Sequence, residues 1–138
     1  MTSASSSAEP PRVRVLLVDD NEAILARAGA VLATACVVVG TAKDGASALE
    51  AAAVLRPDVI VLDISMPGMT GFEVATRLRT AGSEAALVFL TVHADEGFVL
   101  AARGAGVIGY VVKQRLRLDL THAVQEARAG RGFVSPLH

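Results

Sequence analysis

The chain has 138 residues, 52% of them hydrophobic and 20% charged, which suits a single domain with a sizeable apolar core. Its 13 basic and 14 acidic residues give a formal net charge of −1, so the composition carries no polyelectrolyte signal for nucleic acid. Cys36 is the only cysteine, which excludes an internal disulfide and fits a reducing cytosol. Because no run reaches the roughly 18 apolar residues of a transmembrane helix, we expect no membrane contact and a cytoplasmic location.

Residues 1–11 are rich in Ser, Ala and Pro and have neither a basic start nor an apolar segment, which predicts a disordered head and not a signal peptide. Beyond them, short apolar runs that predict strands alternate with stretches whose apolar residues recur every three or four positions, as in amphipathic helices. The predicted strands are 13–18, 36–40, 58–62, 86–90 and 107–112, and the helical patterns cover 24–32, 45–55, 70–79, 95–103 and 120–127.

This alternation predicts an α/β fold, a doubly wound five-stranded parallel sheet with helices on both faces and right-handed crossovers. The domain is expected to span 12–129, with 130–138 as a C-terminal tail or the start of a linker. Asp44 is the expected N-cap of the second helix, whereas Leu116 and Arg117 leave the last helix without an obvious cap.

Acidic side chains follow two of the predicted strands. Asp19 and Asp20 end the first, and Asp63 ends the buried run 59–62 just before Pro67 and Gly68. The carboxyl edge of an open parallel sheet is where ligands bind. Three carboxylates that meet there need a cation, which predicts a site for a hard metal ion.

Two further strands end in complementary groups. Thr91 closes the fourth run with a hydroxyl, and Lys113 closes the fifth with an ammonium. Any one of these residues has an ordinary structural role, as a helix cap, a β-branched strand residue or a surface charge. Their joint order along the chain is far more specific. His93 and His122 have no second ligand at zinc spacing and are expected to be solvated.

These segments resemble the receiver domain of two-component response regulators over about residues 13–136. The matching stretches are VLLVDDNEAIL (15–25), PDVIVLDISMPGMTGFEV (57–74), VFLTVHADE (88–96) and GYVVKQ (109–114). The resemblance implies a flavodoxin-like sheet with strand order 2-1-3-4-5. The closing stretch from Gly109 to Pro136 resembles the NarL/FixJ group, whose members usually carry a LuxR-type helix-turn-helix after a linker.

The resemblance also implies a role for each site residue. Asp63 is the phosphoacceptor and a ligand of Mg²⁺, with Mn²⁺ as an alternative. Asp20 ligates the metal directly, Asp19 acts through water, and the backbone carbonyl of Ser65 completes the protein's share. Lys113 pairs with a phosphoryl oxygen, Thr91 donates its hydroxyl to another, and Tyr110 rotates inward behind Thr91.

The implied function is phosphorylation of Asp63 by a sensor histidine kinase, or by a small phosphodonor, which switches an output face formed by the fourth helix, the fifth strand and the fifth helix. That face is the expected surface of a homodimer. Contact with DNA is expected only through a helix-turn-helix that this chain does not contain. The sequence leaves open whether the chain is a single-domain regulator or a fragment of a transcription factor.

Two rival functions are weighed. A magnesium-dependent phosphatase with an aspartyl nucleophile typically has an Asp-x-Asp spacing at its first strand, but here Asp19 and Asp20 are adjacent. A receiver-like domain that binds partners without being phosphorylated does not need every site position filled. One departure from the family pattern lies in the site itself, because the residue after Thr91 is usually small. Val92 is therefore expected to crowd the phosphoryl entrance.

Overall fold

The structure is a computed structural model that describes residues 11–137. Most of the predicted head, residues 1–10, lies outside the described residues, as does His138. Strands and helices alternate as the sequence predicts, but several boundaries differ. The last helix begins at Leu116 instead of residue 120, the second strand extends to Ala42, and the fifth begins at Gly109 instead of residue 107. The other boundaries agree to within two residues. The elements are β1 (Val13–Val18), α1 (Glu22–Leu32), β2 (Cys36–Ala42), α2 (Gly45–Leu55), β3 (Val59–Leu62), α3 (Gly71–Thr80), β4 (Ala86–Thr91), α4 (Glu96–Gly104), β5 (Gly109–Val112), a 3₁₀ turn (Lys113–Arg115), α5 (Leu116–Arg128) and β6 (Phe133–Val134).

The strands form one parallel sheet in the order β2-β1-β3-β4-β5-β6. The order of the first five strands is the one predicted, but the prediction of a five-stranded sheet is wrong. A sixth strand, Phe133–Val134, pairs with β5 at the edge of the sheet. It was missed because two residues are too few to show a strand periodicity, and its pairing depends on contacts with distant residues.

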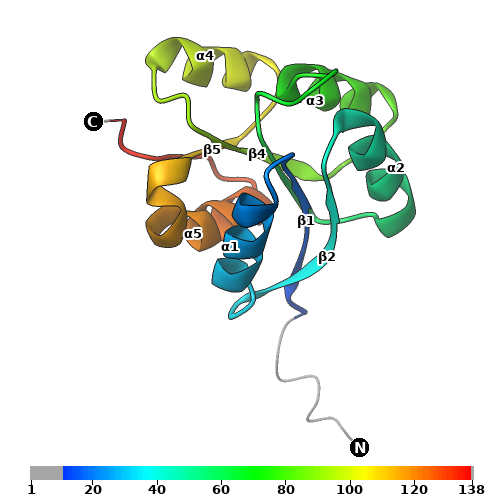
Figure 1. Cartoon of the computed structure of the whole chain (residues 1–138), viewed down its shortest axis with the longest axis horizontal. Helices are drawn as coiled ribbons and strands as arrows, with labels where there is room; N and C mark the ends of the chain where they lie inside the picture. The colour runs from blue at the N-terminus through cyan, green and yellow to red at the C-terminus, as the bar shows by residue number, and fades with distance from the viewer. Residues whose placement is uncertain (1–10, 138) are drawn as a thin grey trace, which may run out of the picture.

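Helices cover the two faces of the sheet, and each face has its own apolar core. Side chains from α1 and α5 pack on one face, for example Leu32 and Leu120, which are fully buried. Side chains from α2, α3 and α4 pack on the other, including Leu78. Figure 1 shows this arrangement, with α1 and α5 on one side of the strands and α2, α3 and α4 on the opposite side. The buried strands therefore read as continuous apolar runs.

Four helices begin with a side-chain cap. Asn21, Asp44, Thr70 and Asp95 each accept a hydrogen bond from a backbone N–H in the first turn of the helix that follows. The expected N-cap role of Asp44 is thus confirmed. Arg115, which precedes α5, forms no side-chain cap bond in the described part of the chain, also as predicted.

The strand register places the site. β1 lies between β2 and β3, and Val18 is paired with Leu62, so the residues that follow them leave the sheet side by side. On the other half, Thr91 is paired with Val112. The acids after β1 and β3 and the groups after β4 and β5 therefore converge on one edge of the sheet. Over residues 11–137, no helix is both long and apolar enough to cross a bilayer.

Candidate phosphoacceptor site

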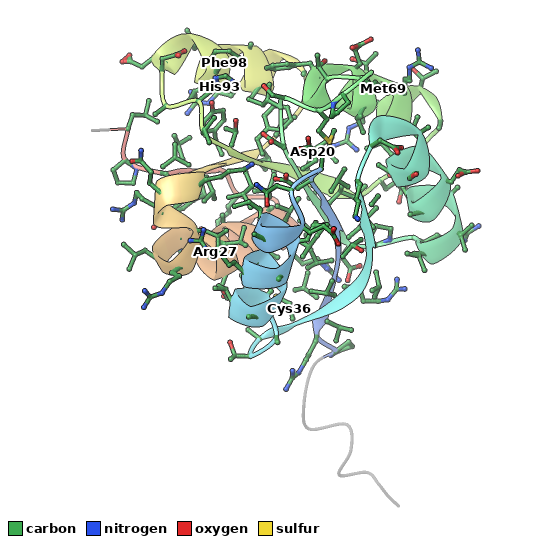
Figure 2. The ribbon with its side chains drawn as sticks, in the orientation of Figure 1. Asp20, Arg27, Cys36, Met69, His93 and Phe98 are labelled. Carbon is green, nitrogen blue, oxygen red and sulfur yellow. The ribbon has the colours of Figure 1, made fainter. Side chains whose placement is uncertain are left out.

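Three carboxylates meet at the carboxyl ends of β1 and β3. Asp19, Asp20 and Asp63 each offer one oxygen, and these oxygens lie within 4.8 Å of one another. Asp19 and Asp63 are 2% and 5% exposed, whereas Asp20 is open to solvent. Figure 2 shows Asp20 where the chain leaves β1 and enters α1. The cluster therefore has two buried members and one at its mouth.

Lys113 reaches the cluster from the end of β5. Its Nζ lies 2.9 Å from Asp19 Oδ2 and 3.0 Å from Asp63 Oδ2. Only the contact with Asp63 has the geometry of a hydrogen bond. Asp19 Oδ2 is buried, and among the described residues its polar partner is the Lys113 ammonium, with which it forms an ion pair but no well-aligned hydrogen bond. Three carboxylates against one ammonium leave this cluster with an excess of negative charge, which suits it to a further cation.

Charge and burial act against each other in this cluster. Burial raises the pKa of Asp19, and the nearby Asp63 adds to that rise, against the opposing hydrogen bond from the Asn21 amide and the contact with Lys113. Burial alone would lower the pKa of Lys113, but its contacts with Asp19 and Asp63 outweigh burial and raise that pKa above the ordinary lysine value. Lys113 is therefore firmly cationic, and a second positive charge would relieve Asp19.

Thr91 and Tyr110 lie beside the cluster, both buried. The Thr91 hydroxyl accepts a hydrogen bond from the His93 amide at 3.3 Å. The Tyr110 hydroxyl donates to the His93 carbonyl at 2.7 Å. Burial is the main cause that raises the pKa of Tyr110 to about 12, so the phenol keeps its proton. The Tyr110 side chain is thus buried, and its hydroxyl is bonded to the loop after Thr91.

The loop after β4 contains a contact that the sequence did not reveal. His93 Nε2 lies 2.9 Å from the Ser65 hydroxyl, and the His93 ring stacks on Phe98 with centroids 4.3 Å apart. Figure 2 shows His93 and Phe98 next to each other below α4. His93 is half-buried, although it was expected to be solvated. The only sequence signal was its position two residues after Thr91.

The remaining predicted residues lie at the rim. Ser65 is exposed, and its amide donates to Asp63 Oδ1 at 3.4 Å. The Val92 side chain is 66% exposed, so it does not fill a buried pocket. The structure therefore brings the three acids, Thr91 and Lys113 together, while Ser65 and Val92 flank them.

A glycine allows the loop after β3 to pack closely under the site. The Gly71 amide donates to the Ile64 carbonyl at 2.7 Å, so the first residue of α3 lies against the backbone that carries Asp63. A Cβ atom at Gly71 would meet the Asp63 carbonyl oxygen first, then Ile64 Cα and Phe89 Cε1, each at 2.9 Å. Only glycine fits here without displacing either backbone.

Comparison with known proteins identifies the family. The protein-family model for the response regulator receiver domain matches residues 15–125 of this sequence. The chain belongs to this family. NarL of Mycobacterium tuberculosis is 36% identical over 135 residues, covering 95% of this chain and 62% of that protein. NarL of Escherichia coli is 34% identical, covering 94% and 60%. This receiver domain thus spans about three fifths of the length of these relatives.

Solved structures agree with this assignment. The receiver domain of M. tuberculosis NarL superimposes with a TM-score of 0.83 at 33% identity, covering 88% of this chain and all of that one. A LuxR-family response regulator from Aurantimonas gives a TM-score of 0.86 at 30% identity, covering 91% of both chains. The chain is therefore a receiver domain of the NarL/LuxR type, which is a signalling domain, and it has a flavodoxin-like fold.

Proposed function

We propose that this receiver domain accepts a phosphoryl group on Asp63 in the presence of Mg²⁺ and so acts as a switch in transcription regulation. The observation that supports this most directly is the position of Lys113, whose Nζ lies between the buried carboxylates of Asp63 and Asp19 and forms an ion pair with each. Such a site has a nucleophile and a fixed ammonium ion. Its three carboxylates outnumber that one positive charge, so it can bind a second cation.

The donor set fits a hard divalent ion. Asp20 and Asp63 would hold Mg²⁺ directly, the Ser65 carbonyl would add a third oxygen, and Asp19 would act through water. Oxygen ligands of this kind suit Mg²⁺, with Mn²⁺ as the alternative. When bound, the metal neutralises charge on the phosphoryl oxygens and aligns them with the nucleophile.

The chain's own residues carry the transfer. A carboxylate oxygen of Asp63 attacks phosphorus, a P–O bond forms, and the P–N bond to the donor histidine breaks with its electron pair passing to the imidazole nitrogen. Lys113 exchanges its bond to Asp63 for one to a phosphoryl oxygen, as a point charge. Thr91 turns its hydroxyl toward another phosphoryl oxygen. Because the amide of His93 is bonded to Thr91 Oγ1 and its carbonyl to Tyr110, movement of Thr91 shifts this loop and the packing of Tyr110.

The partners follow from this role. A sensor histidine kinase donates the phosphoryl group in the cytoplasm, and the changed surface is the α4–β5–α5 face, through which the domain forms a homodimer. DNA is reached only through a LuxR-type helix-turn-helix outside this chain. The domain is a stoichiometric phosphoacceptor and not an enzyme with turnover on an external substrate. Residues 12–129 form the receiver, and residues 130–138 are a C-terminal tail or the start of a linker, of which Phe133–Val134 adds a strand to the receiver's sheet.

The test is covalent loading of Asp63. Wild type incubated with radiolabelled acetyl phosphate and Mg²⁺ should take up one base-labile phosphoryl group per chain, and Asp63→Asn should take up none. Asp58→Asn is the matched control, because Asp58 is an aspartate at the opposite end of β3. Loading of Asp63→Asn at the wild-type level would refute the assignment. Steady release of phosphate from an added phosphoester would instead support the phosphatase.

A further inference from the structure

The segment after α5 does not leave the domain. It turns at Gly130 and runs along the outer edge of β5, where the Phe133 amide donates to the Ile108 carbonyl at 3.3 Å and the Ser135 amide to the Tyr110 carbonyl at 2.8 Å. We call residues 131–137 the strap. The edge of β5, which would be open in a five-stranded sheet, is therefore covered by the chain itself.

Three residues on one face of α5 contact the strap. Asp119, His122 and Glu126 are spaced three and four residues apart, so they point the same way from the helix. Each contacts a different residue of the strap: Asp119 accepts a bond from the Ser135 hydroxyl at 2.7 Å, His122 lies edge-on to the Phe133 ring with centroids 5.2 Å apart, and Glu126 pairs with the Arg131 guanidinium at 2.8 Å. The strap is thus fastened at three successive points along the helix.

The contact between Ser135 and Asp119 is buried, and each polar group in it depends on the others for a hydrogen bond. Ser135 is 1% exposed and Asp119 6%. The Ser135 hydroxyl donates to Asp119 Oδ2 and accepts a bond from the Val112 amide at 3.3 Å, while Arg115 Nε donates to the same Oδ2 at 2.7 Å. If Ser135 were withdrawn without replacement, a backbone amide of β5 and a buried carboxylate would both lose a partner.

Apolar residues of the strap join both cores. Phe133, together with Ile108, packs against the core under α5, and Val134 and Leu137 pack against the core under α4. The strap therefore closes the sheet edge on both faces. An extended segment that pairs with a sheet edge and places alternate side chains on opposite faces is how a sheet binds a peptide strand.

We propose that the groove between the edge of β5 and α5 is a docking site for an extended segment, occupied in cis by the strap and latched by Asp119, and that the strap masks the α4–β5–α5 face from a second copy of this chain. Tethering gives the strap a high effective concentration, so it excludes a competing segment while the latch holds. Release would uncover the β5 backbone that now pairs with β6. The helices of this face also carry exposed apolar side chains, Leu100 on α4 and Leu118 on α5.

Hydrogen exchange on the full chain tests the latch without any phosphodonor, so the result does not depend on phosphorylation of Asp63. Asp119→Asn and Ser135→Ala should each accelerate exchange of the strap amides, Phe133 and Ser135, roughly tenfold or more. Asp44→Asn is the matched control, since it also removes an aspartate at a helix N-terminus, where Asp44 caps α2. Unchanged exchange at Phe133 and Ser135 in both latch variants would overturn the proposal.

A peptide in trans tests the groove. A fluorescent peptide with the sequence of residues 130–137 should bind the full-chain double variant Phe133→Ala, Ser135→Ala, whose own strap is weakened and whose groove is intact. It should bind wild type at least tenfold more weakly, and adding Asp119→Asn to the double variant should remove binding. Equal binding to wild type and the double variant, or none to either, would refute the docking site. Sedimentation tests the masking: the double variant should associate at concentrations where wild type remains monomeric, and identical sedimentation would show that the strap masks nothing.

Discussion

Gly71→Ala should destabilise the domain and slow its phosphorylation, because this glycine lets α3 lie against the backbone of Asp63. The added Cβ would be closest to the Asp63 carbonyl oxygen, and would also lie 2.9 Å from Ile64 Cα and from Phe89 Cε1. Two of these atoms belong to backbone that is held in place by β3 and by the bond from Gly71 to Ile64. Neither can move without shifting Asp63.

The magnitude follows from two opposing effects. Replacing glycine with alanine in a helix stabilises it by up to about 1 kcal/mol, and less at the first helical position. Forcing a methyl group into a filled space costs about 1 to 3 kcal/mol. For Gly71 the second effect wins, and we expect a net loss of about 1 to 2 kcal/mol. Gly29, in the middle of α1, has no atom within 4 Å of its added Cβ, so Gly29→Ala should gain about 0.5 to 1 kcal/mol.

Urea unfolding of the two variants and wild type, followed by circular dichroism, measures both effects. The variants should fall on opposite sides of wild type, and acetyl phosphate loading should be slower only for Gly71→Ala. If Gly71→Ala proves as stable as Gly29→Ala, the close approach between α3 and the Asp63 backbone does not limit this position, and the reasoning is wrong.

Three further predictions concern the metal, the entrance and the latch. Asp20→Ala should weaken Mg²⁺ binding about tenfold or more in calorimetry, because it removes a ligand. Because Asp20 is exposed, the free energy of unfolding should change by less than about 0.5 kcal/mol. An unchanged magnesium titration would contradict the ligand role of Asp20. Val92→Ala should speed loading by acetyl phosphate in stopped-flow experiments, and rates equal to wild type would rule out steric crowding at the entrance. Burial would raise the pKa of Asp119, but the hydrogen bonds from Arg115 and Ser135, together with the charges of Arg115 and His122, hold it below its ordinary value of 3.8. The ionised Asp119 carboxylate therefore contributes its full stabilisation above pH 3.8 and loses it as the pH falls through its lower pKa in the folded state. The difference in the free energy of unfolding between wild type and Asp119→Asn should accordingly shrink in acid. A difference that does not depend on pH would contradict a charged Asp119 latch.

The sequence by itself determined the alternation of strands and helices and the placement of the acids. Apolar runs such as 59–62, bounded by turn residues, predict buried strands. In a parallel sheet the last residues of such strands emerge at one edge, so the sequence predicts that Asp19, Asp20, Asp63, Thr91 and Lys113 converge. Local hydrogen bonding also made Asp44 recognisable as a cap, since the partner of a cap lies within the same turn.

Tertiary structure alone decided what depends on residues far apart in the chain. The sixth strand has two residues, too few to show a periodicity. It is held in place by its pairing with β5 and by the bond from Ser135 to Asp119, which lies sixteen positions away in the sequence. Ser65 and His93 are separated by 28 positions, and nothing in either local sequence announces their contact. Val92 follows a fully buried residue yet faces solvent, because β4 ends at Thr91 and the chain turns there. Such contacts arise only when separate elements have packed, so no local pattern in the sequence encodes them.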